Sequence, residues 1–290
     1  YSNAVRVMTT FLDAVYAEFI SKAKDLPFME KAVRFANEHR SIGIGVLGYH
    51  SYLQSKMIPF ESVIARTINR QIFQTIDRQS KSHSRYMGLS FGSPKVLEGY
   101  AERFSTRMAV APTTSSSFIL GQVSPSIEPL QSNYFTKDLA KGKFTYRNPY
   151  LKKLLAEKGM DTETTWKSIM MKGGSVQHLD FLDQDEKDTF KTFAEISQLE
   201  IITQAADRQQ FIDQGQSLNL MIDDEVPLKD INKLVITAWE LGIKTLYYQR
   251  ALSLPGRLKY LQCLKRLQIA PNLQPNPNPM WCRKEIAFTS

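Results

Sequence analysis

A run of five hydroxyl residues, Thr113 to Ser117, interrupts an otherwise well-mixed sequence. Its flanks, "RMAVA" before the run and "FILGQV" after it, have the apolar character of buried structure rather than of a linker. Pro112 ends the first flank, so a short strand, a turn and the start of a helix are expected in succession. Free N–H groups and the positive dipole at a helix start attract anions, and hydroxyls add donors. The run therefore suggests a phosphate-binding turn, and the alternative is an ordinary helix N-cap with additional serine and threonine residues.

Two adjacent tyrosines, Tyr247 and Tyr248, lie in the strand-like stretch "KTLYYQ". Neighbouring residues of a strand point to opposite faces of the sheet. At most one of the two rings is therefore expected in an ordinary core without a role for its hydroxyl. The pattern alone favours one tyrosine in the core and the other at the surface.

The other residues that commonly perform chemistry form no recognisable site. The carboxylates of Asp207 and Asp213 have no identifiable partner and are expected to be structural. The glycine run "GIGVLG" lacks the spacing of a dinucleotide fingerprint and the acidic residue about 20 positions further on. The four histidines have no metal-ligand spacing, so no metal site is expected. They are His39, His50, His83 and His178.

Length and composition indicate a globular protein. The chain has 290 residues, of which 42% are hydrophobic and 23% charged, enough apolar content for one large domain or two ordinary ones. The longest apolar stretches fall far short of the roughly 20 residues that a membrane span needs, and no secretory segment follows the start. Two cysteines, Cys263 and Cys282, cannot form a disulfide framework and indicate a reducing compartment. We expect a cytoplasmic protein with no membrane association.

The net charge of +8 is concentrated at the C-terminal end of the sequence. Residues 251–290 carry +5 of it, and they also hold five of the 13 prolines, in stretches such as "PNLQPNPNP". Proline-rich sequence cannot continue a helix or a central strand, so a domain boundary is expected near residue 250. The preceding 250 residues show no basic stripe with interleaved aromatic residues, so nucleic-acid binding is not expected there.

Helix and strand patterns alternate through the first 250 residues. This alternation predicts a parallel α/β architecture rather than a helix bundle or a β-sandwich. Because residues 2–23 already have a helical pattern, the chain is expected to be part of something longer. Asp183 and Glu186 have the spacing of a capping box, and Gly88 and Gly242 are expected to end helices. Helices are expected at 2–23, 61–88, 182–209 (one helix or a pair) and 227–242, and strands at 107–112, 217–222 and 244–249, with a glycine-bearing apolar run at 41–53 that leads into a helix.

Four stretches in this order resemble the C-terminal half of the large (alpha) subunit of aerobic, class I ribonucleotide reductases. They are "RSIGIGVLGYHSYLQ", "MAVAPTTSSS" followed by "SIEP" at 126–129, "RQQFIDQGQSLNL" and "GIKTLYYQR". The sequences "SYLQSKMIPFES" and "NYFTKDLAKG" are most similar to those of bacteriophage-type members. The resemblance covers residues 1–250 and implies the second half of a ten-stranded α/β barrel, with 251–290 as an irregular, basic, proline-rich tail that matches nothing in the family.

The resemblance also implies roles for the two motifs. The family's hydroxyl turn binds the diphosphate of a ribonucleoside diphosphate substrate, which implicates Thr113, Thr114, Ser115 and Ser116. Its adjacent tyrosines carry the radical toward the active-site cysteine, which implicates Tyr247 and Tyr248. The radical comes from the diiron-tyrosyl centre of a partner small subunit, and thioredoxin or glutaredoxin reduces the whole enzyme. No cofactor is expected on this chain.

Several parts of the family's machinery are missing from the sequence. The thiyl cysteine, the redox-active cysteine pair, the assisting Asn and Glu, and the effector-binding segments all belong upstream. Phe104 in "AERF" stands where the family has Asn, and Cys263 and Cys282, 19 positions apart, do not form the family's closely spaced redox pair. We therefore expect part of a large subunit that acts with its N-terminal half and the small subunit, in the cytoplasm of a host if it is phage-encoded. The alternatives are an inert remnant that binds phosphate ligands or a partner subunit and, resting on the tail charge, a basic nucleic-acid accessory protein.

Overall fold

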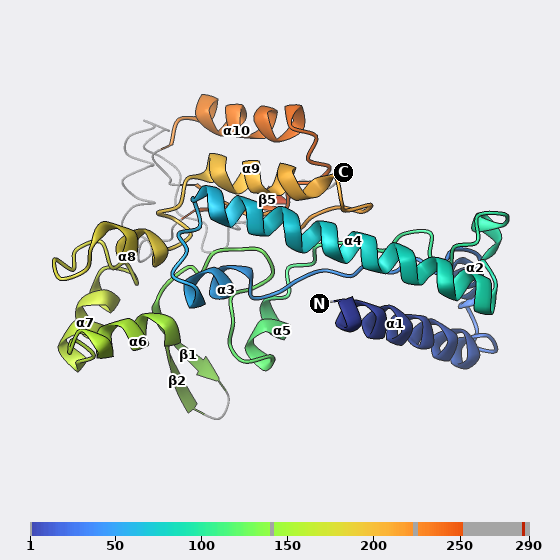
Figure 1. The fold of residues 1–290 in the computed structure, drawn as a ribbon, viewed down its shortest axis with the longest axis horizontal. Coiled ribbons are helices and arrows are strands. Elements are labelled where there is room, and N and C mark those ends of the chain that lie inside the picture. Colours follow the sequence, from blue (N-terminus) through green and yellow to red (C-terminus); the bar gives the residue numbers. More distant parts are fainter. Residues whose placement is uncertain (1, 140–141, 223–225, 252–285, 288–290) are drawn as a thin grey trace, which may run out of the picture.

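The computed structural model describes residues 2–139, 142–222, 226–251 and 286–287 (Figure 1). Helices and short strands alternate along these residues, as the sequence predicts. The helices are α1 (Ser2–Ala23), α2 (Glu30–His39), α3 (Tyr49–Ser55), α4 (Val63–Phe91), the 3₁₀ helix η1 (Lys95–Leu97), α5 (Thr114–Ile119), α6 (Pro149–Glu157), α7 (Glu163–Met171), α8 (Gln184–Thr189), α9 (Gln198–Gln209) and α10 (Leu228–Glu240). The strands are β1 (Tyr134–Leu139), β2 (Gly142–Arg147), β3 (Leu220–Ile222), β4 (Tyr248–Ala251) and β5 (Ile286–Ala287).

Four extended segments lie side by side and run parallel. Ile44 forms a bridge with Met108, and Val110 forms one with Gln216. Further along the third segment, β3 pairs in parallel with β4. The order in space is thus 42–44, 106–110, 214–222 and 247–251, the same as the order in sequence. This succession is the α/β architecture predicted from the alternation, although the expected strand at 107–112 is reduced to single bridges.

Helices cover this set of parallel segments. Figure 1 shows α4, α9 and α10 stacked in successive layers. Phe73 of α4 and Ile202 of α9 are fully buried, and they belong to one apolar core with Met108 and Leu218 of the extended segments. Burial of one such side chain stabilises the fold by roughly 1.5–3 kcal/mol. A smaller second core forms around Trp166, where α6 and α7 pack near the β1–β2 hairpin.

Two glycines that were expected to end helices behave differently. Gly242 follows α10 with a φ of +78°, as predicted. Gly88, in contrast, lies inside α4, which continues to Phe91 and ends at Gly92 with a φ of +84°. A Cβ at position 88 would lie 2.7 Å from the carbonyl group of Ala101, so glycine permits the chain to cross the helix closely there. The prediction of a helix end at Gly88 was therefore wrong.

The stretch 182–209 folds as two helices, α8 and α9. The expected capping box is present, because the Asp183 carboxylate accepts a hydrogen bond from the Glu186 N–H and the Glu186 carboxylate accepts one from the Asp183 N–H.

The outer edge of β4 is paired, since β5 runs antiparallel to it at Tyr248 and Gln249. Apart from Ala251 and β5, the tail 251–290 lies outside the described residues, and the boundary near residue 250 stays a prediction.

His50 of α3 is fully buried, and its burial should make the stability of the fold depend on pH. Its Nδ1 accepts a hydrogen bond from the Leu130 N–H at 2.9 Å, and burial lowers its pKa to about 3. In the unfolded chain the pKa is the ordinary 6.5, so between pH 6.5 and 3 only the unfolded state takes up this proton. The free energy of unfolding should therefore fall as the pH drops below 6.5, by about 2 kcal/mol at pH 5 on account of His50.

Urea unfolding of wild-type and His50→Gln chains between pH 5 and pH 7.5 measures this contribution. Glutamine can still accept the Leu130 hydrogen bond but does not titrate, so the variant should lose less stability on acidification. Equal losses in the two chains would contradict the assignment.

Candidate functional site

The hydroxyl run forms a strained turn followed by the short helix α5. Thr113 precedes the helix in the left-handed conformation, with a φ of +49°, which is uncommon for a residue other than glycine. Its Oγ1 accepts a hydrogen bond from the Ser126 N–H at 2.8 Å and makes no cap bond to its own helix. The interpretation of the run as an ordinary N-cap is thus wrong for Thr113, whose side chain fixes the turn to the segment at 126.

The next three residues leave their hydroxyls free at the surface. Thr114, Ser115 and Ser116 are exposed, and no hydrogen bond from their side chains to another described residue is present. Ser117 is buried and donates a hydrogen bond to the Thr114 carbonyl at 2.9 Å. The first N–H groups of a helix also have no partner within the helix. The turn thus gathers side-chain and main-chain donors that suit an anion.

The two tyrosines contact each other instead of facing apart. Their ring centroids are 3.9 Å apart with an interplanar angle of 47°, and both residues are half-buried. The expectation of one core and one surface ring was therefore wrong. β4 begins only at Tyr248, so Tyr247 lies outside the regular strand and the alternation of faces does not hold between them.

A hollow of about 470 Å³ lies beside the extended segments and reaches Tyr247 and the residue before the hydroxyl run. Pro112, directly before the hydroxyl run, lines it on one side, and Tyr247 lines it on another. The other lining residues are Ala109, Val110, Ala111, Gln214, Gly215, Gln216, Ser217, Thr245 and Leu246. The hollow therefore extends from the residue before the hydroxyl run to Tyr247.

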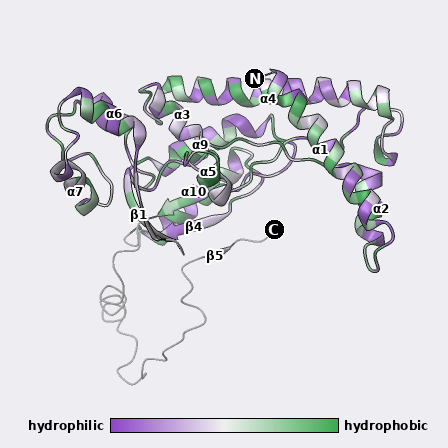
Figure 2. Ribbon diagram, turned by 90° about the horizontal axis from the view of Figure 1, so that it is seen from below, coloured by the Kyte–Doolittle hydropathy of each residue, from purple (hydrophilic) through white to green (hydrophobic). Residues whose placement is uncertain are grey.

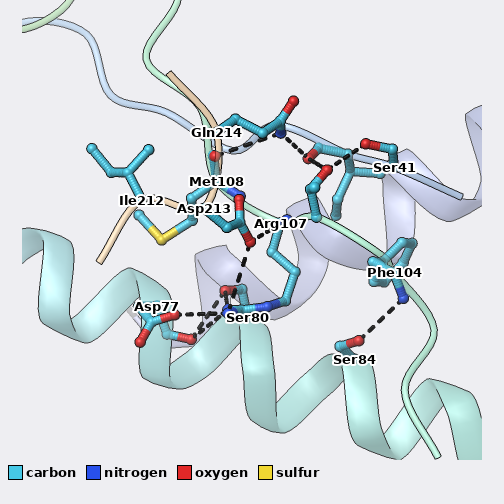
Figure 3. Close-up of polar contacts among 12 residues, drawn as sticks. Ser41, Asp77, Ser80, Ser84, Phe104, Arg107, Met108, Ile212, Asp213 and Gln214 are labelled. Carbon is cyan, nitrogen blue, oxygen red and sulfur yellow. Dashed lines mark hydrogen bonds and ion pairs between the residues drawn. The ribbon is translucent and has the colours of Figure 1, made fainter. Parts of the chain in front are cut away.

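A second hollow, of about 510 Å³, is lined by charged residues that already have partners. Figure 3 shows Arg107 between Asp77 and Ser80 of α4, with the Arg107 Nη2 2.9 Å from the Asp77 Oδ1. The Asp213 carboxylate accepts hydrogen bonds from the N–H groups of Arg107 and Met108. Asp207 pairs with arginines of α4, so both aspartates are structural, as expected.

Phe104 occupies the core and not a ligand site. Only 1% of its surface is exposed, and its N–H donates a hydrogen bond to the Ser84 Oγ at 3.3 Å (Figure 3). The aromatic side chain is thus accommodated by burial at the position where the resemblance leads us to expect Asn.

Two polar residues that we did not single out in the sequence lie beside the tyrosines. Glu128 and Asn219 are both buried, and the Asn219 amide donates a hydrogen bond to the Glu128 carboxylate. Burial raises the pKa of Glu128 to about 7, against the opposing charge of Arg250. The only signal in the sequence is that these residues belong to the quoted stretches "SIEP" and "SLNL".

Parallel segments that are covered by helices and follow one another in space as in sequence define the class as a partial α/β barrel. The family model described as "Ribonucleotide reductase, barrel domain" matches residues 1–102 and 93–249. The chain belongs to this family, as its resemblance predicts. The bacteriophage-type affinity stays a prediction.

Several relatives are ribonucleotide reductase large subunits. The "Ribonucleoside-diphosphate reductase large subunit" of Invertebrate iridescent virus 3 is 43% identical over 84% of this chain and 39% of its own length. The large chain from Schizosaccharomyces pombe is 33% identical over 79% of this chain and 32% of its own length. The structure of the Actinobacillus ureae class Id ribonucleotide reductase alpha subunit superposes with a TM-score of 0.82 and 52% identity, over 86% of this chain and 46% of that one. The chain thus spans less than half the length of these relatives.

Two further findings concern the described residues only. No helix among them is both long and apolar enough to cross a membrane. No cluster of three or more histidine, cysteine, aspartate or glutamate side chains in this part of the chain could hold a metal ion.

Proposed function

We propose that this chain supplies the substrate-diphosphate site and the radical-transfer tyrosines of a ribonucleoside-diphosphate reductase. The hollow lined by Tyr247 and by Pro112, the residue directly before the hydroxyl turn, is the observation that carries the proposal. A substrate held by its diphosphate at the turn would extend into the same space that the tyrosines reach. The chain would act within a complex and not by itself.

The hydroxyl turn suits a diphosphate in its geometry. The bond from Ser126 to Thr113 holds the turn in place, and it leaves the hydroxyls of Thr114, Ser115 and Ser116 available. Hydrogen bonds from hydroxyl and N–H donors to a charged phosphate are stronger than those between neutral groups. In this proposal Thr113 positions the turn, and the three residues after it contact the phosphate oxygens.

Replacing Thr114 or Ser115 by alanine should weaken binding of a ribonucleoside diphosphate. Each lost hydrogen bond to the charged ligand is worth roughly 1.5–3 kcal/mol, which is about tenfold or more in Kd. Calorimetry with the assembled enzyme measures the change. Ser55→Ala removes an exposed hydroxyl from α3, outside the turn, and is the matched control. Unchanged affinity in both turn variants would refute the diphosphate assignment.

The contacting tyrosine rings suit stepwise radical transfer. A phenol can lose an electron and a proton together, and a centroid separation of 3.9 Å makes the hop between the two rings short. The radical would originate at the metal cofactor of a small subunit and pass through Tyr248 and Tyr247 toward a cysteine outside this chain. A closed barrel would shield the radicals from solvent. Thioredoxin or glutaredoxin would then regenerate the complete enzyme, and a cytoplasmic location stays a prediction.

A further inference from the structure

The backbone at the tyrosine pair departs from a regular strand. Successive N–H groups of an extended strand point to opposite edges. Here both tyrosine N–H groups point to the neighbouring segment, since Tyr247 donates to the Leu218 carbonyl at 2.9 Å and Tyr248 donates to the Asn219 Oδ1 at 3.0 Å. A regular strand would direct the two rings to opposite faces of the sheet. The irregular backbone at this point is found together with rings that contact each other.

On the side of β3, a side chain rather than a backbone carbonyl therefore accepts the hydrogen bond of the Tyr248 N–H. Asn219 can accept from Tyr248 only while its amide oxygen faces β4. The Glu128 carboxylate maintains that orientation, because it accepts a hydrogen bond from the Asn219 Nδ2 on the other side. Glu128 and Asn219 are only 4% and 1% exposed, so water cannot readily replace either bond.

The backbone around Glu128 is fixed by contacts that do not involve its carboxylate. The Ser126 N–H donates to Thr113, and the Leu130 N–H donates to His50. At the tyrosine end of the chain of hydrogen bonds from Glu128 through Asn219 to Tyr248, the Arg250 guanidinium lies 5.7 Å from the centroid of the Tyr248 ring. A change in the Glu128 side chain should thus disturb the tyrosine anchor and leave the hydroxyl turn in place.

We propose that Glu128 and Asn219 are positioning residues that hold Tyr247 and Tyr248 in the ring contact needed for radical transfer. This inference rests on the proposed function and adds two residues to it. Neither residue exchanges an electron. Glu128 orients the Asn219 amide, and Asn219 sets the backbone from which the Tyr248 ring projects.

The test uses the complete large subunit with its small subunit and compares kcat with KM. Asn219→Ala and Glu128→Ala should lower kcat on the order of 10- to 100-fold through misplacement of the rings. KM for the ribonucleoside diphosphate should stay within about twofold, because the hydroxyl turn keeps its own supports. Glu128→Gln can still accept the bond from Asn219 and should restore most of the kcat that Glu128→Ala loses.

Asn133→Ala is the control for a general loss of stability. Asn133 is as buried as Asn219, at 1% exposure, and its amide donates to the carbonyl groups of Gly174 and Phe190, which belong to the second core region. The control should unfold at a lower temperature and keep its kcat. A wild-type kcat in Asn219→Ala would overturn the proposal, as would a loss of kcat in Asn133→Ala equal to that in Asn219→Ala.

If Asn219→Ala does not fold, the two Glu128 variants test the proposal instead. Equal kcat values in Glu128→Ala and Glu128→Gln would show that the hydrogen bond between Glu128 and Asn219 has no role in positioning the rings. The phenylalanine variants of the tyrosines separate this inference from the proposed function. If the phenylalanine variants are active, the proposed function fails. If the phenylalanine variants are inactive while the Glu128 and Asn219 variants keep wild-type kcat, only the positioning role fails.

Discussion

Tyr247→Phe and Tyr248→Phe should each reduce turnover with the small subunit to background. Phenylalanine keeps the ring and its packing but lacks the hydroxyl whose proton leaves together with the electron. The fold and the affinity for the diphosphate should therefore survive, since the N–H groups of both residues keep their bonds to the segment at 218–219. Assays of deoxyribonucleotide formation and calorimetry of substrate binding measure the two effects separately.

Tyr86→Phe is a suitable control for the loss of a phenol. Tyr86 lies on α4, is 61% exposed, and is remote in sequence from the pair. Its variant should turn over normally. Near-normal turnover in both Tyr247→Phe and Tyr248→Phe would show that radical transfer does not pass through this pair.

The geometry of the tyrosine pair illustrates what sequence patterns could not predict. The helix at 2–23 follows from a local apolar pattern, and its observed bounds match the expected ones, whereas only Tyr248 and Gln249 of the expected strand 244–249 belong to β4. The contact between the rings depends on Asn219, and the orientation of Asn219 depends on Glu128, which is 91 residues away in sequence. Such a network is tertiary, so no local periodicity reveals it.

Gly88 shows the same limit at the level of an element. A glycine after a helical pattern normally marks the end of the helix. Here the helix continues for three further residues, and the glycine is required because the segment at Ala101 crosses the helix closely at Gly88. The helix start set by the local capping box of Asp183 and Glu186 was predictable, whereas a glycine required inside a helix by a crossing chain could not be told from one that ends a helix.

The hydroxyl turn was predictable as a candidate anion site but not in its construction. Its residue types and its place between two apolar flanks are local features. The left-handed Thr113 and its bond to Ser126 depend on a segment 13 residues away that packs beneath the turn. The three exposed hydroxyls after it are the part that the sequence pattern anticipates.

The chain with the small subunit alone should not form deoxyribonucleotides. Ribose reduction in this family requires a thiyl radical and a thiol pair, and residues 1–250 contain no cysteine. The chain also covers only 46% of the matching alpha subunit. We therefore propose that an upstream half supplies the missing thiols and closes the barrel.

Exposed apolar side chains on α1 and α4 are compatible with the proposed upstream half. Val7 and Phe11 of α1 are 61% and 60% exposed, and Leu89 and Phe91 near the end of α4 are 78% and 65% exposed. Figure 2 shows hydrophobic and hydrophilic residues alternating along both helices. We propose that the upstream half packs against these exposed side chains. The isolated chain should thus associate readily or dissolve poorly, and it should bind diphosphates weakly.

The expected pairing of strand edges needs one correction. An isolated half-barrel should leave both its first and its last strand unpaired, but β5 covers the outer edge of β4 at Tyr248 and Gln249. At the opposite end, the segment 42–44 is joined to the segment at 106–108. Its other edge is where the upstream half would add its strands, since open edges favour pairing with another chain.

Mixing separately expressed halves with the small subunit tests this arrangement. Deoxyribonucleotide formation should require all three components, and addition of the upstream half should raise the solubility of this chain and its affinity for diphosphates. Activity from this chain and the small subunit without the upstream half would overturn the proposal. If the three components assemble and bind substrate but form no product, the chain is an inert remnant that retains ligand and partner binding. Phe104 is a poor explanation for such a result, because it is buried in the core, so the cause would be sought in the tyrosine pair and its Glu128–Asn219 anchor.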